Sequence, residues 1–126
     1  MGYAEPVLGT RMHSAGLVLQ GVLTPARWLE FLAEVAKAIG MSAVDEAKVW
    51  TYPALDGKGG SGQTIVLPVT ESFLALDTWA DHHGAYLLVC SCRSYYTADI
   101  DLVAERFGLK VVLHPSRRFY HELDLK

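Results

Sequence analysis

Positively charged residues are few in this sequence. Among its 126 residues, Lys and Arg number 11 and Asp and Glu number 14, which gives a formal net charge of −3. The chain therefore lacks the excess of positive charge that would bind a nucleic-acid backbone. We expect no nucleic-acid partner.

Long apolar runs and a secretion signal are missing as well. Apolar runs such as residues 87–90 are far shorter than the roughly 18 residues that a membrane-spanning helix needs. Residues 1–10 carry neither the basic start nor the apolar stretch of a signal peptide. These absences predict a cytoplasmic protein with no membrane partner.

Cysteine is scarce. The sequence has two cysteines, Cys90 and Cys92, with one residue between them. A disulfide between such close neighbours on a strand would be badly strained, so we expect reduced thiols, as in the cytosol. No second cysteine pair is present and the five histidines show no ligand spacing with these two, so the sequence predicts no metal site.

Apolar side chains, in contrast, are plentiful. Hydrophobic residues make up 51% of the chain, enough for one core, and the length is too short for two ordinary domains. We therefore predict a single domain over residues 1–126.

Two segments have the apolar spacing of amphipathic helices. The first begins after Thr24, which is followed by a proline at the first helical position, and ends at Gly40. The second begins at Thr97, expected to cap it, and ends at Gly108.

Six segments have the composition of strands, and two terminal segments have no clear pattern. The expected strands are residues 15–23, 47–52, 63–69, 72–79, 85–92 and 110–113. We expect an extended lead-in over residues 1–12, and the polar tail from residue 116 receives no assignment. This order of elements predicts an α+β fold, a two-layer sandwich in which an antiparallel sheet carries both helices on one face.

A glycine-rich segment precedes the third expected strand. Residues 56–62 hold four glycines, but Gln63 stands where a phosphate-binding loop needs its lysine, and the segment leads into a strand rather than a helix. We interpret it as a flexible hairpin or lid connection.

The motifs that indicate a function lie in residues 70–92. Residues 70–81 read Thr-Glu-Ser-Phe-Leu-Ala-Leu-Asp-Thr-Trp-Ala-Asp, and residues 85–92 read Ala-Tyr-Leu-Leu-Val-Cys-Ser-Cys. This part of the chain resembles the prokaryotic S-adenosylmethionine decarboxylase family. In that family a Glu-Ser pair precedes a strand ending in Ile-His-Thr-Trp-Pro-Glu, and the next strand ends in Thr-Cys. Glu71 and Ser72 match the pair, and Cys92, 20 residues after Ser72, matches the second strand end. The resemblance extends along most of the chain and is strongest over residues 62–92.

The resemblance implies a self-cleaving enzyme that makes its own cofactor. Ser72 would attack the carbonyl of Glu71, and elimination followed by hydrolysis would leave a pyruvoyl group derived from Ser72 at the new N-terminus. That group forms a Schiff base with the substrate amine and acts as the electron sink for decarboxylation. Cys92 would protonate the resulting carbanion.

The resemblance also implies the remaining site residues and partners. Asp77 would be catalytic, Thr64 would assist processing with Glu71 and Ser72, and the substrate would contact Glu71, Phe73 and Trp79. The implied substrate is S-adenosylmethionine, whose product serves spermidine synthesis, and the implied assembly is a homodimer with associated sheets.

Three positions depart from the family pattern and keep other functions open. Asp77 stands where the family has a histidine that assists processing, Phe73 replaces a histidine of many members, and Thr64 replaces a serine. A carboxylate lacks the donor that an imidazole offers. Two alternatives therefore remain: a pyruvoyl decarboxylase of an amino acid such as ornithine or arginine, or an unprocessed paralogue that binds a ligand or partner.

Overall fold

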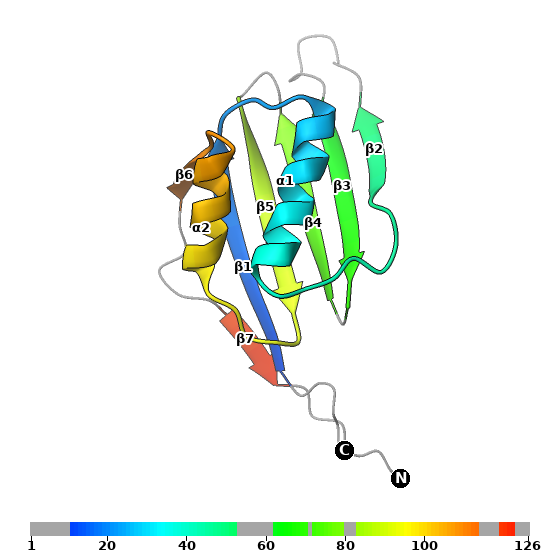
Figure 1. Ribbon diagram of the computed structural model, residues 1–126, viewed down its shortest axis with the longest axis vertical. Coiled ribbons are helices and arrows are strands. Elements are labelled where there is room, and N and C mark those ends of the chain that lie inside the picture. The colour runs from blue at the N-terminus through cyan, green and yellow to red at the C-terminus, as the bar shows by residue number, and fades with distance from the viewer. Residues whose placement is uncertain (1–10, 53–61, 71, 80–82, 114–118, 123–126) are drawn as a thin grey trace.

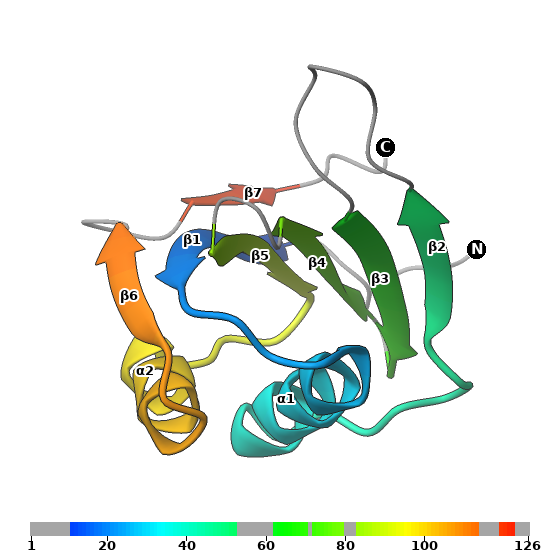
Figure 2. The same cartoon turned by 90° about the horizontal axis from the view of Figure 1, so that it is seen from above.

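Two helices lie on one face of an antiparallel sheet (Figures 1 and 2). This architecture comes from a computed structural model, which describes residues 11–52, 62–70, 72–79, 83–113 and 119–122. The predicted α+β two-layer sandwich with both helices on one face is confirmed.

The described residues form seven strands and two helices. In chain order they are β1 (Arg11–Gln20), α1 (Pro25–Ala38), β2 (Lys48–Tyr52), β3 (Gly62–Val69), β4 (Ser72–Trp79), β5 (Gly84–Ser91), α2 (Thr97–Arg106), β6 (Lys110–Leu113) and β7 (Phe119–Glu122). The strand order is β2-β3-β4-β5-β1-β6, with β7 paired to β1, and every pairing is antiparallel. None of the described helices has the length and apolarity that crossing a membrane requires.

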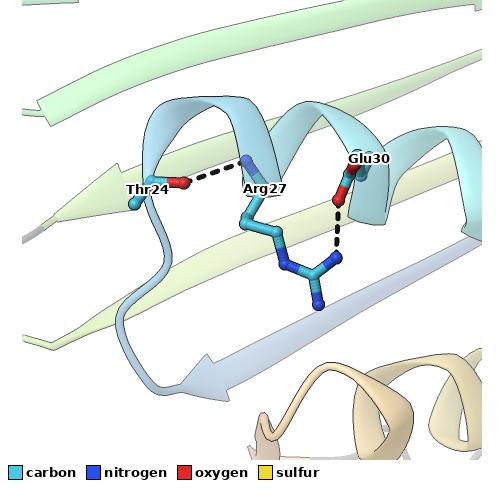
Figure 3. Close-up of polar contacts among 3 residues, drawn as sticks. All are labelled: Thr24, Arg27 and Glu30. Carbon is cyan, nitrogen blue, oxygen red and sulfur yellow. Dashed lines mark hydrogen bonds and ion pairs between the residues drawn. The ribbon is translucent and has the colours of Figure 1, made fainter.

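The sequence signals at the start of α1 operate as expected (Figure 3). The Thr24 hydroxyl accepts a hydrogen bond from the Arg27 N–H at 3.2 Å, and Pro25 occupies the first turn. The Arg27 guanidinium pairs with the Glu30 carboxylate one turn later. The cap satisfies one of the backbone N–H groups that a helix start leaves without a partner.

The core lies between the sheet and the helices. Its largest fully buried side chains are Phe31, Leu17, Leu19, Leu32, Ile65, Leu74, Leu76, Leu87, Ile100, Val35, Val89 and Val103. In every long strand they occupy alternate positions, because successive side chains point to opposite faces. The intervening residues form the other face of the sheet, which no described helix covers (Figure 2). We call it the open face.

The strand boundaries differ from the sequence prediction at β1 and β7. β1 begins at Arg11 and ends at Gln20, earlier than the predicted strand at both ends, and β7 falls in the tail that received no assignment. The early start of β1 and the presence of β7 have one cause: residues 11–14 pair with β7, so each of these short segments becomes a strand by pairing with the other.

The start of α2 also differs in detail. Thr97 is the first residue of the helix, and the cap position is Tyr96, which makes no side-chain capping hydrogen bond. The predicted threonine cap is therefore wrong. Residues 56–61, which are the glycine-rich segment without Gly62, lie outside the described residues.

Candidate active site

The antiparallel pairing of β4 with β5 brings Ser72 and Cys92 together. Ser72 is the first residue of β4, and Cys92 follows the last residue of β5. The Cys92 backbone N–H donates a hydrogen bond to the Ser72 Oγ at 3.0 Å, and both residues are half-buried. Residues 20 positions apart in the sequence thus form one local site.

The two cysteines differ in their surroundings. Cys90 lies on the open face opposite Phe73 and Ser14, is buried, and has its thiol pKa raised by that burial. The strand predicted to run through Cys92 ends at Ser91, so Cys92 sits in the bend that follows. Both thiols are free. Burial disfavours the thiolate at Cys90, whereas Cys92 is accessible beside Ser72.

Thr64 and Asp77 form a second pair. They lie directly opposite each other on β3 and β4, and the Thr64 hydroxyl donates a hydrogen bond to the Asp77 Oδ1 at 2.5 Å. Both are half-buried on the open face. Two of the three positions that depart from the family pattern are thus joined by a hydrogen bond.

The two pairs are separate within one chain. Asp77 lies five residues after Ser72 along β4, and an odd number of steps places their side chains on opposite faces. At about 3.3 Å per residue, their Cα atoms are roughly 16 Å apart. Asp77 therefore does not contact Ser72 of the same chain.

The residues expected to bind substrate are spread over the molecule. Phe73 is 39% exposed on the open face, next to Ser72 in sequence but on the other side of the sheet. Trp79 is at the far end of β4, where it lines a cavity of about 190 Å³ with Trp28 and Thr78. The Trp79 Nε1 is buried and has no hydrogen-bond partner among the described residues. Glu71 lies outside the described residues.

The open face is hollowed around Asp77. A depression of about 450 Å³ is lined by Asp77 and Thr64, by the small residues Gly16 and Ala75, and by the Tyr86 ring, which is 57% exposed. One carboxylate beside an aromatic ring is suited to a cationic group. Among the described residues, no three His, Cys, Asp or Glu side chains are grouped to hold a metal ion.

Two further residues lie beside Ser72 and received no role from the sequence. Ser91 on β5 is directly opposite Ser72, and His13 on β1 is directly opposite Ser91. Ser91 is a polar residue with only 1% of its surface exposed. The motif match placed Ser91 at the threonine of the family's Thr-Cys but gave it no role. No sequence signal marks His13, because its proximity to Ser72 depends on the pairing of β1 with β5.

Comparison with known proteins identifies the family. A family model described as S-adenosylmethionine decarboxylase matches residues 21–118, which is most of the chain. The chain belongs to the S-adenosylmethionine decarboxylase family. A comparison with curated proteins found no match.

A solved structure supports the assignment at the level of the fold. The crystal structure of the adenosylmethionine decarboxylase from Aquifex aeolicus VF5 superposes with a TM-score of 0.60 at 17% sequence identity, covering 94% of this chain and 96% of that chain. The resemblance stated from the sequence is confirmed, and membership of the S-adenosylmethionine decarboxylase family supports a decarboxylase.

Proposed function

We propose that this chain is a pyruvoyl-dependent decarboxylase of S-adenosylmethionine that cleaves itself between Glu71 and Ser72. The observation that supports this most directly is the hydrogen bond from the Cys92 N–H to the Ser72 Oγ at 3.0 Å. It joins the nucleophile of the cleavage step to the residue proposed as proton donor in the decarboxylation step. The substrate would be a small molecule, and the product would serve polyamine synthesis.

The residues around Ser72 fit the cofactor that the family implies. Ser72 begins β4, so cleavage before it would leave the new N-terminus at a strand end beside the free thiol of Cys92. A pyruvoyl group there would supply an electron sink for the electrons of the departing carboxyl group. During cleavage, the backbone N–H of Cys92 would hold the Ser72 oxygen in place until that oxygen leaves with the Glu71 carboxylate. In the decarboxylation that follows, the Cys92 thiol would donate a proton to the substrate carbon.

We also propose that the open face mediates a homodimer, as the family resemblance implies. This face exposes a series of large apolar side chains: Trp50 (44%), Tyr52 (46%), Phe73 (39%), Tyr86 (57%) and Leu88 (42%). Several large apolar side chains exposed on one face are typical of an interface. Such an interface would bury the hydrogen-bonded Thr64 and Asp77 against the second copy. The free thiols suit the reducing cytoplasm, where we propose the enzyme works.

Intact mass measured under denaturing conditions tests self-cleavage. We expect the purified protein to yield two fragments, residues 1–71 and residues 72–126, the second with a blocked N-terminus. Ser72→Ala should remain full length under the same conditions. A wild-type chain that stays intact for days would refute the pyruvoyl mechanism and favour the unprocessed paralogue.

Release of labelled carbon dioxide then identifies the substrate. The cleaved protein should release it from carboxyl-labelled S-adenosylmethionine. Release from ornithine or arginine alone would mean that the pocket is specific for an amino acid. No release from any of the three would reject the decarboxylase function.

The two cysteines provide a matched pair for the proton-donor role. Cys92→Ala should decarboxylate but lose activity with turnover, because the proton then reaches the wrong carbon and inactivates the enzyme. Cys90→Ala should keep linear progress curves. Identical curves for the two variants would exclude Cys92 as the proton donor.

A further inference from the structure

Three side chains form a row across the sheet at the cleavage site. His13 on β1 is opposite Ser91 on β5, and Ser91 is opposite Ser72 on β4. Directly opposed residues of antiparallel strands point to the same face, with Cβ atoms about 4.5–5.5 Å apart. The imidazole of His13 is therefore separated from the Ser72 hydroxyl by a single small side chain.

That intervening side chain is suited to pass a proton. Ser91 is 1% exposed, and its Oγ accepts a hydrogen bond from the Arg93 N–H at 2.9 Å. A hydroxyl has one proton to donate and two lone pairs, so Ser91 can still accept from one neighbour while it donates to the other. Burial excludes bulk water, which would otherwise compete for the proton.

The Ser72 oxygen is also held for such a transfer. It accepts the Cys92 N–H, which fixes the direction of one lone pair and stabilises negative charge on the oxygen once its proton has left. The attack also requires a base that takes the hydroxyl proton. Asp77 lies on the opposite face about 16 Å away, and its carboxylate already accepts the Thr64 hydroxyl.

We propose that His13 takes the proton of the Ser72 hydroxyl through Ser91 when the chain cleaves itself. This inference rests on the proposed self-cleavage at Ser72. As the bond from the Ser72 Oγ to the preceding carbonyl carbon forms, the hydroxyl proton passes to Ser91 and the Ser91 proton passes to His13. When the bond from that carbon to the Ser72 nitrogen breaks, the proton returns along the same row to the nitrogen. The rearrangement from amide to ester needs no other reactant. His13 does not touch the reacting atoms. It acts on them through Ser91 and is therefore a positioning residue.

Cleavage rates of single and double variants test the relay. His13→Ala and Ser91→Ala should each slow the appearance of the two fragments by about 10²–10⁴-fold, the usual contribution of a positioned acid or base. The double variant should be no slower than the slower single variant, because both substitutions break the same chain. Added imidazole should restore part of the rate in His13→Ala. The control is His83→Asn, at the other end of the sheet, where the left-handed backbone (φ 53°) tolerates asparagine; it should cleave at the wild-type rate.

Three results would overturn the relay: a wild-type rate in His13→Ala, additive losses in the double variant, or no response to imidazole in a folded His13→Ala. A wild-type chain that does not cleave would reject the proposed function instead. The relay is still tested in that case by the ¹⁵N shifts of the His13 imidazole. They should change in Ser91→Ala and not in Ser14→Ala, since Ser14 lies on the open face. Unchanged shifts in Ser91→Ala would refute it.

Discussion

Gly62, the first residue of β3, occupies a position where a methyl group has no room. A Cβ placed there would lie less than 3.0 Å from the carbonyl oxygen of Thr78, a distance that real Cβ atoms essentially never show. That oxygen belongs to the backbone of β4, which is paired with β3. It can move away only if the distance between the two hydrogen-bonded strands increases. Overpacking of this kind costs about 1–3 kcal/mol.

Widening the ladder would also weaken a neighbouring contact. The Gln63 N–H donates to the Thr78 hydroxyl at 3.2 Å, and loss of such a bond costs about 1 kcal/mol. We therefore expect Gly62→Ala to lower the free energy of unfolding by about 2–4 kcal/mol. For a domain of this size the melting temperature should fall by roughly 10 °C.

Gly16 on β1 is the matched control. A Cβ there has no atom within 4 Å, and its φ is not in the left-handed region. Replacing a strand glycine by alanine without strain stabilises a fold by about 0.5–1 kcal/mol. Urea denaturation of the two variants, with thermal melting in parallel, measures the difference. Equal stabilities of Gly62→Ala and Gly16→Ala would refute the steric argument.

Three further predictions concern the helix start, the core and a buried thiol. Thr24→Ala should cost about 1 kcal/mol in urea denaturation while Thr24→Ser costs almost nothing, because the cap needs only the hydroxyl; equal losses would show that the cap does not contribute. Leu74→Ala, at a fully buried site, should cost about 2–5 kcal/mol, whereas Leu102→Ala, at a helix site 59% exposed, should cost far less. Burial raises the pKa of the Cys90 thiol above its unfolded value, so the folded state keeps that proton more tightly and this stabilisation is lost as pH rises through the raised pKa. Wild-type stability should thus fall more steeply above pH 9.0, the ordinary value, than that of Cys90→Ala, and parallel pH profiles would contradict this.

The sequence predicts the elements whose structure depends on local patterns. The start of α1 was predictable because a threonine, a proline and an apolar stripe occur at fixed spacing. β4 and β5 were predictable because their apolar residues alternate or run together. β7 was not, since the segment Phe119–Glu122 has only four residues without a clear alternation and becomes a strand by pairing with β1.

The same distinction applies to the candidate site. The motif match identified Ser72 and Cys92, and the fold joins them by a hydrogen bond. The motif gave no information on faces of the sheet, so it grouped Asp77 with Ser72, although the odd spacing along β4 places them on opposite sides. His13 remained unidentified, and Ser91 was matched only as the neighbour of Cys92, because cross-strand neighbours are set by register, which a single sequence does not contain.

The order of strands determines how a cut chain would behave. A break before Ser72 would leave β1, β2 and β3 in one product and β4, β5, β6 and β7 in the other. In the sheet these products interleave: β3 pairs with β4, and β1 lies between β5 on one side and β6 and β7 on the other. Neither product can leave without breaking these ladders and opening the shared core, so the two would stay together as a non-covalent heterodimer. Unfolding would nevertheless change from a unimolecular to a bimolecular equilibrium. The melting temperature of the cut protein would then fall more steeply on dilution than that of the intact Ser72→Ala chain, because dissociation of the two fragments adds to any dissociation of subunits.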